Sequence, residues 1–139
     1  MTDLSSIGRD YLDAWNRRDW ARYKELMHSD YSYTGGDGQR LDSVDAGVGV
    51  GQMFAAAFPD GRINVKQVYA AGNAVTIEFV GEGTHTGDFA GVPPSGRKVS
   101  IPVCDVLEIR DGKIHSEHEY IDMLSLMQQI GAIPQGAMA

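Results

Sequence analysis

Two ionisable residues on either side of a turn in the last third of the chain could form a hydrogen-bonded pair. Asp105 precedes and His118 follows the dipeptide Asp111-Gly112, which is typical of a two-residue β-hairpin turn. The register that this turn sets places Asp105 directly opposite His118, where Cβ atoms lie about 4.5 to 5.5 Å apart. A carboxylate at that distance can orient an imidazole for acid/base chemistry, and the same pair could also be a buried structural contact without chemistry.

The same register defines a face of the hairpin that combines apolar and ionisable side chains. Four ionisable residues share this face: Asp105, His118, Tyr120 and Asp122. Glu117 and Glu119 fall on the opposite face, which is therefore expected to be the wetter one. Ionisable groups on an apolar face are unfavourable unless they are paired or used, so we expect this face to form the wall of an active site.

Asp122 has two possible roles, because it stands directly before a short helix expected at residues 123–130. A carboxylate in that position is often an N-cap, although Ser125, three residues on, does not complete a capping box. Position alone therefore favours capping over catalysis for Asp122.

Other candidates are weaker. His85 lies where a strand becomes a loop, and a loop histidine is more often solvated or structural than catalytic, although loops do carry sites. Several aromatic residues recur at helical or strand spacing and are most simply core or cavity lining: Tyr11, Trp15, Phe54, Phe79 and Phe89.

The spacing of apolar residues predicts the elements that must position these groups. Helical periodicity covers residues 4–15, 20 to about 28, and 43–57, whereas alternation with a period of two begins at residue 62. Strands are predicted at 62–70, 74–86, 99–109 and 113–122, followed by the short helix at 123–130. Helices followed by a meander of strands indicate an α+β fold, and we expect one domain over residues 1–139 with the helices on the concave side of the sheet.

Composition excludes several classes of protein. The chain has 139 residues and a formal net charge of −7, which leaves no basic stripe for nucleic acid. It has no apolar stretch long enough to span a membrane and no basic, apolar leader, so we expect a cytoplasmic protein. Its single cysteine, Cys104, permits no internal disulfide and no Cys-x-x-Cys metal site, and no phosphate-binding glycine motif is present.

Three segments resemble the SnoaL-like polyketide cyclase family in order and spacing: GTHTGDFAGVPPSGR at 83–97, DGKI at 111–114 and DMLSLMQQIG at 122–131. The resemblance implies the nuclear transport factor 2-like, or ketosteroid isomerase-like, cone, in which a strongly curved, mostly antiparallel sheet wraps around three N-terminal helices. It also implies a homodimer or higher oligomer, an enclosed apolar pocket, and ring closure of a polyketide by intramolecular aldol condensation without metal or cofactor. Asp122 matches the aspartate that serves as acid/base in this family, which favours its catalytic role, while Tyr33 replaces a histidine that is common there.

Together these arguments predict an enzyme that acts on an apolar, polyketide-like small molecule. The expected catalytic residues are Asp122, His118 and Asp105, and the expected substrate-binding residues are Tyr120, Trp15, Tyr33, Phe54, His85 and Phe89. Two alternatives stay open: isomerisation, dehydration or hydration of a steroid-like or polyketide-like compound, and a module that binds a small molecule without catalysis, since a shared fold does not fix function.

Overall fold

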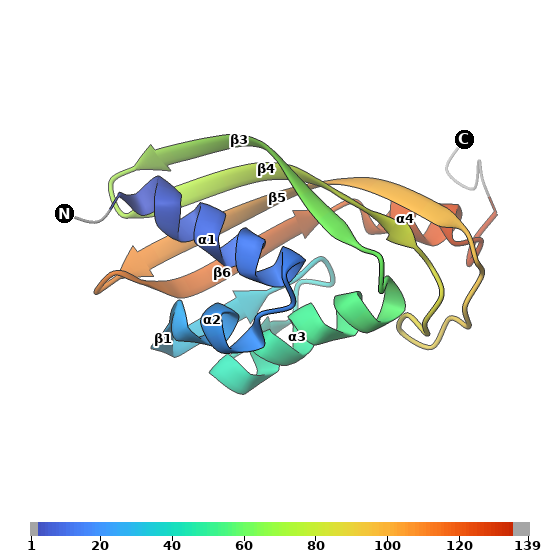
Figure 1. The fold of residues 1–139 in the computed structure, drawn as a ribbon, viewed down its shortest axis with the longest axis horizontal. Helices are drawn as coiled ribbons and strands as arrows, with labels where there is room; N and C mark the ends of the chain where they lie inside the picture. Colours follow the sequence, from blue (N-terminus) through green and yellow to red (C-terminus); the bar gives the residue numbers. More distant parts are fainter. Residues whose placement is uncertain (1–2, 135–139) are drawn as a thin grey trace.

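In the computed structural model, which describes residues 3–134, a curved and unclosed sheet of six strands covers three helices on one side (Figure 1). The helices are α1 Leu4–Asn16, α2 Trp20–Glu25, α3 Val44–Ala57 and α4 Met123–Gln129. The strands are β1 Met27–Thr34, β2 Arg40–Leu41, β3 Arg62–Ala71, β4 Ala74–Thr84, β5 Lys98–Arg110 and β6 Lys113–Ile121. Helices α1, α2 and α3 lie on the concave face, and α4 lies at one end of the sheet (Figure 1). The predicted α+β fold is confirmed.

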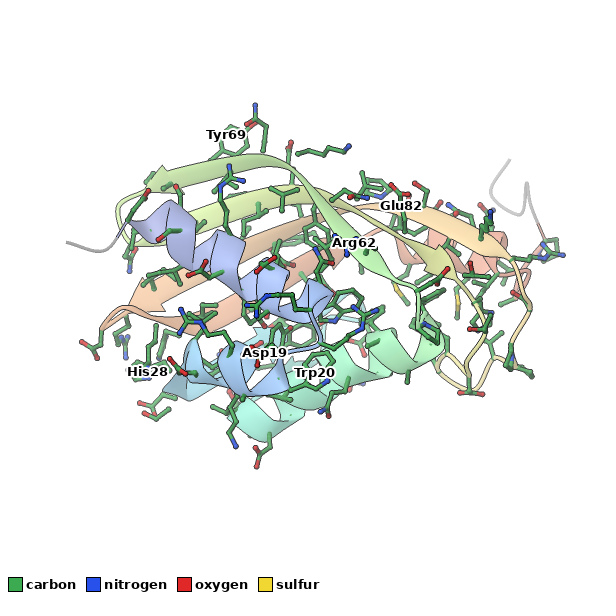
Figure 2. The ribbon with its side chains drawn as sticks, in the orientation of Figure 1. Asp19, Trp20, His28, Arg62, Tyr69 and Glu82 are labelled. Carbon is green, nitrogen blue, oxygen red and sulfur yellow. The ribbon has the colours of Figure 1, made fainter. Side chains whose placement is uncertain are left out.

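Each helix begins at a residue whose side chain caps it. The carboxylate of Asp19 accepts a hydrogen bond from the backbone N–H of Arg22 and thereby starts α2 (Figure 2). The hydroxyl of Ser43 does the same for α3. No helix within residues 3–134 is both long enough and apolar enough to cross a membrane.

The second helix is shorter than predicted, because a strand begins where the helical pattern was expected to continue. Helix α2 ends at Glu25, and the next residues form β1, which pairs in parallel with β6 and antiparallel with the short β2. The apolar residues Leu26 and Met27 fit either period, so the sequence pattern did not separate helix from strand there. Tyr31 and Tyr33 alternate on one face of β1, and this spacing was the available signal for a strand.

The last hairpin turns as predicted but does not keep the predicted register. Asp111 and Gly112 have φ angles of 54° and 73°, as a type I′ turn requires, and Ile109 faces Ile114 beside it. A β-bulge then follows, so that Glu108 faces Ser116 and His115 is the extra residue. Because side chains alternate along a strand, this one-residue shift moves the rest of β6 to the opposite face.

Strand order places the hairpin at the centre of the molecule. The sheet runs β2-β1-β6-β5-β4-β3, so β5 and β6 are both flanked by other strands. Their inward side chains face α1 to α3 across the core, where Leu107 and Ile114 are fully buried. Any polar group on this face is therefore held away from water by both the sheet and the helices.

Candidate active site

An apolar cavity of about 100 Å³ lies between the concave face of the sheet and the helices. Six aromatic side chains line it: Trp15, Tyr23, Tyr33, Phe54, Phe58 and Phe79. Aliphatic side chains of β5, including Val99, Ile101 and Val103, complete much of the wall. At about 30 Å³ for each water molecule, a cavity of this size holds about three such groups, which suits the reacting end of a substrate better than a whole multi-ring molecule.

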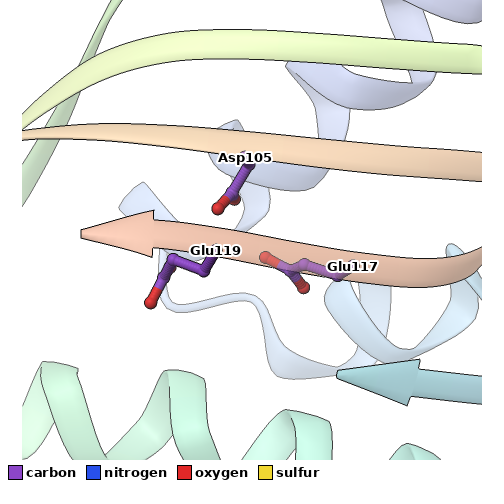
Figure 3. Close-up of side chains that lie close together, drawn as sticks. All are labelled: Asp105, Glu117 and Glu119. Atoms are coloured by element: carbon purple, nitrogen blue, oxygen red, sulfur yellow. The ribbon is translucent and has the colours of Figure 1, made fainter. Parts of the chain in front are cut away.

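Three carboxyl groups from β5 and β6 meet in this cavity (Figure 3). Asp105 faces Glu119 across the strand pair, and Glu117 lies two residues before Glu119 on the same side of β6. One carboxylate oxygen from each residue lies within 4.8 Å of the others. Asp105 is 1% exposed and Glu117 is 3% exposed, so these two carboxyl groups are almost fully removed from bulk water, whereas Glu119 is partly buried.

Tyrosine hydroxyls from two other elements hold the glutamates. Tyr11 of α1 and Tyr31 of β1 both donate to Oε1 of Glu117, at 2.5 and 2.7 Å. Tyr33 of β1 donates to Oε1 of Glu119 at 2.9 Å. Burial raises the pKa of all three tyrosines, and the nearby glutamates raise it further, so these hydroxyls stay protonated as donors.

Burial and mutual repulsion hold protons on part of the cluster. Burial raises the pKa of Glu119 to about 7, the charge of Glu117 adds to this effect, and the hydrogen bond from Tyr33 opposes it. Burial, followed by the charges of Glu117 and Glu119, raises the pKa of Asp105 well above its usual range. Oδ1 of Asp105 is buried, and a hydrogen bond between the Asp105 and Glu117 side chains also raises the pKa of Asp105. The cavity therefore contains a protonated acid next to a carboxyl group that ionises near neutral pH.

The expected pair of Asp105 and His118 does not form. His118 faces Val106 on the outer face of the sheet, where its ring stacks on Tyr120 at a centroid distance of 5.8 Å. Tyr120 is 61% exposed and lines the outer groove instead of the apolar cavity, so the structure does not place it with Asp105. The bulge at His115 is the physical reason, since it exchanges the two faces of β6.

Asp122 is exposed and caps α4, because its Oδ1 accepts a hydrogen bond of 2.9 Å from the backbone N–H of Ser125. It lies beside His118 and Tyr120 along an open groove on the outer face of the sheet and does not line the apolar cavity. The structure thus shows the capping role that was expected from the place of Asp122 directly before the helix. A catalytic role for Asp122 stays a prediction.

The predicted substrate-binding residues divide into two groups. Trp15, Tyr33 and Phe54 line the cavity. Phe89 packs on Phe54 from outside the cavity wall, at a centroid distance of 5.5 Å. His85 is fully buried elsewhere, and its Nδ1 accepts a hydrogen bond from the backbone N–H of Ser95, so this histidine orders the loop after β4.

The sequence argument missed the two glutamates at the centre of the site. Glu117 and Glu119 were assigned to the wet face by the unshifted register, and the bulge that brings them inward leaves no mark in the residue types around His115. One signal was available: a strand that carries two tyrosines and pairs with β6 supplies hydroxyl donors for buried carboxylates. The same three carboxyl groups are the cluster within residues 3–134 whose geometry could also ligate a metal ion.

Comparison with known proteins agrees with this architecture. A family model described as SnoaL-like polyketide cyclase matches residues 6–130. The chain therefore belongs to the SnoaL-like polyketide cyclase family.

Three relatives illustrate the likeness. Nogalonic acid methyl ester cyclase from Streptomyces nogalater is 28% identical over 82 residues, which cover 59% of this chain and 61% of that protein, so less than two thirds of the relative is matched. The crystal structure of AclR, a candidate hydroxylase from Streptomyces galilaeus, is 27% identical with a TM-score of 0.84 and covers 95% of this chain and 83% of AclR. IdmH from Streptomyces antibioticus, a candidate polyketide cyclase, is 27% identical with a TM-score of 0.82 and covers 94% of this chain and 99% of IdmH.

Proposed function

We propose that this protein is an acid/base enzyme that closes a ring of a polyketide-like compound by intramolecular aldol chemistry, without a cofactor. The observation that carries the proposal is the cluster of Asp105, Glu117 and Glu119 inside an apolar cavity. Membership of the cyclase family supports it. The partial likeness to nogalonic acid methyl ester cyclase supports the methyl ester of an organic acid as a trial substrate.

In this proposal Glu119 is the general base. A base works best when its pKa lies near the working pH, and a pKa of about 7 leaves Glu119 substantially ionised at neutral pH yet more basic than an exposed carboxylate. Glu119 removes a proton from a carbon next to a carbonyl group, and the electrons of that C–H bond form an enolate. The enolate carbon attacks a second carbonyl carbon of the same molecule, and the resulting alkoxide takes the proton back from Glu119.

Asp105 and Glu117 have different roles in the same step. Asp105 retains its proton because its pKa is raised by burial and by its neighbours, so it can donate a hydrogen bond to the enolate oxygen. Glu117 accepts hydrogen bonds from two tyrosines, which hold its carboxylate in place. The charge of this carboxylate raises the pKa of Asp105 and of Glu119. Three similar carboxyl groups thus act as base, acid and fixed charge.

Asp122 is the competing candidate for the base, because it matches the aspartate of the family motif. For this role its carboxylate would have to leave the N–H of Ser125 and turn from the outer groove into the cavity. Glu119 needs no such movement, since it already lines the cavity. We therefore assign the base to Glu119 and use Asp122 as the comparison.

An isomerase is the second candidate, because the same cluster supports it. If the substrate has no second carbonyl group within reach, Glu119 can return the proton to a different carbon of the enolate, which moves a double bond. The product of either reaction is an isomer of the substrate.

We also propose that the protein forms a homodimer through the outer face of the sheet. Tyr120 on β6 is 61% exposed there, and Cys104 and Val106 of β5 are only partly buried on the same face. A second copy of the face would cover these side chains. Light scattering at micromolar concentration should give twice the mass of the chain, and a monomeric mass would contradict the proposal.

Activity can be tested with a trial substrate, nogalonic acid methyl ester, and with simpler polyketide esters that carry two ketones. Liquid chromatography with mass detection should show conversion to a product of unchanged mass and different retention. The Glu119→Gln variant should convert the same substrate at least one hundred times more slowly. Equal conversion by the wild type and by this variant would contradict the proposal.

A further inference from the structure

The tyrosines around the carboxyl cluster differ in what their hydroxyls do. Tyr11, Tyr31 and Tyr33 each donate a hydrogen bond to a glutamate of the cluster. Tyr23 of α2 also lines the cavity and is 6% exposed. Within residues 3–134, no carboxyl group of the cluster accepts the proton of Tyr23, so this proton is available to a ligand.

Packing fixes the ring of Tyr23 but leaves its hydroxyl able to turn. The ring stacks on Tyr11 at a centroid distance of 4.3 Å, and Trp20 packs edge-on against it at 5.5 Å. Gly51 of α3 leaves room for the hydroxyl, because a Cβ there would lie 3.2 Å from the Tyr23 oxygen. The neighbouring hydroxyl of Tyr11 gives its own proton to Glu117, so it offers Tyr23 only a lone pair. The O–H of Tyr23 can therefore rotate toward a ligand in the cavity.

The environment of Tyr23 keeps its hydroxyl protonated. Burial raises the pKa of Tyr23 well above its usual range, and the charge of Glu117 raises it further, while a hydrogen bond with Tyr11 lowers it. The phenol is therefore a neutral donor at neutral pH. A donor that is already held in place within an apolar cavity stabilises negative charge that develops on a bound substrate.

Ring closure needs a donor at a second oxygen of the substrate. When the enolate carbon attacks the second carbonyl carbon, a C–C bond forms and the π electrons of that carbonyl group move onto its oxygen. In the proposed function Asp105 donates to the enolate oxygen, which leaves the second oxygen to another group. Asp105 comes from the sheet, whereas Tyr23 comes from α2 on the helical side of the cavity (Figure 1). A substrate between the two sides can present one oxygen to each donor.

We infer that Tyr23 is a further catalytic residue, which donates a hydrogen bond to the second carbonyl oxygen and so polarises the group that the enolate attacks. The inference rests on the proposed function. Tyr23 keeps its proton throughout, and the alkoxide takes the proton that Glu119 removed from carbon. The substrate is then a compound with two carbonyl groups, because isomerisation develops negative charge on one oxygen and does not need this donor.

The Tyr23→Phe variant separates enolate formation from ring closure. It retains the ring that stacks on Tyr11 and loses only the hydroxyl. Loss of one donor to a developing oxyanion costs roughly 10²- to 10³-fold in rate, so kcat for ring closure of the trial substrate should fall by at least about one hundredfold. Enolate formation is measured as deuterium uptake from D₂O by an analogue with a single ketone. This rate should stay within about threefold of the wild type, because the base Glu119 is intact.

Tyr69→Phe is the matched control, because Tyr69 is 53% exposed on β3 and does not line the cavity (Figure 2). Both of its rates should equal those of the wild type, and a thermal unfolding curve shows that each variant is folded. Two results for Tyr23→Phe would overturn the inference: ring closure at the wild-type rate, or equal loss of ring closure and of deuterium uptake.

These results are distinct from failure of the proposed function. If Glu119→Gln lost both reactions while Tyr23→Phe retained both, only the role of Tyr23 would be overturned, and the acid/base mechanism would stand. If the wild type performed neither reaction, the proposed function would be overturned together with the inference that rests on it.

Discussion

The exchange of Glu119 for glutamine, compared with the exchange of Asp122 for asparagine, separates the two candidate bases. Both substitutions replace a carboxylate by an amide of nearly the same size. In Glu119→Gln the amide oxygen can still accept the hydrogen bond from Tyr33, and in Asp122→Asn the amide oxygen can still cap α4. Neither change should therefore prevent folding, and each removes only the ability to accept a proton.

The expected loss of activity follows from the role of a general base. Such a group contributes roughly 10²- to 10⁴-fold to the rate, which corresponds to about 2.7 to 5.4 kcal/mol of transition-state stabilisation. We expect kcat of Glu119→Gln to fall by at least one hundredfold at pH 7, whereas kcat of Asp122→Asn should stay within about threefold of the wild type. The trial substrate is measured under saturating conditions, so that binding and chemistry are separated.

Stability gives an independent readout for the same variant. Because the pKa of Glu119 is raised from 4.5 to about 7 in the folded protein, the wild type loses stability as the pH rises through this interval, where the unfolded chain ionises Glu119 and the folded protein keeps it protonated. Glutamine cannot ionise, so Glu119→Gln should match the wild type near pH 4.5 and exceed it above pH 7. Each unit of raised pKa corresponds to about 1.4 kcal/mol, so the gain in the free energy of unfolding is at most about 4 kcal/mol.

The opposite pattern would refute the assignment. If Asp122→Asn lost one hundredfold or more in kcat while Glu119→Gln stayed within a few-fold, the base would be the family-matched aspartate in the outer groove. If Glu119→Gln were also no more stable than the wild type at high pH, Glu119 would not be a desolvated carboxyl group.

The remaining predictions concern the rest of the site and its support. The rate should rise with pH with an apparent pKa near 7, because Glu119 must be ionised to act, and a flat profile between pH 5 and 8 would contradict this. His118→Ala should leave kcat/KM within about twofold of the wild type, because the imidazole lies on the outer face of the sheet. A large loss would indicate that His118 acts with Asp105 in catalysis. Gly87→Ala should lower the free energy of unfolding by about 1 to 3 kcal/mol, since a Cβ at this position would overlap the carbonyl oxygen of Ala56, and chemical denaturation with an unchanged midpoint would disprove this close approach.

Much of the fold could be predicted because its signals are local. The helix starts near residues 20 and 43, the change of period at residue 62 and the turn at Asp111-Gly112 each depend on a few neighbouring residues, and the structure contains all of them. Strand β1 was missed because its identity depends on pairing with β6, more than 80 residues away in sequence. Local periodicity does not report such a contact.

The prediction of the site depended on the register between β5 and β6, which a single extra residue changes. The face of β5 that carries Asp105 was predicted correctly, because apolar alternation marks it over the whole strand. On β6 the extra residue at His115 reverses the faces, which brings Glu117 and Glu119 inward and moves His118 and Tyr120 outward. The ionisable wall of the cavity is therefore formed by Asp105, as expected, together with Glu117 and Glu119 in place of His118 and Tyr120.

Enolate formation at Glu119 is tested most directly by proton exchange with solvent. The trial substrate is incubated in D₂O with the wild type or with Glu119→Gln, and deuterium at the carbon next to the carbonyl group is followed by mass spectrometry. The mechanism predicts that the wild type incorporates deuterium into recovered substrate or product at least one hundred times faster than the variant. Equal incorporation by the two proteins, or ring closure by Glu119→Gln at the rate of the wild type, would contradict it.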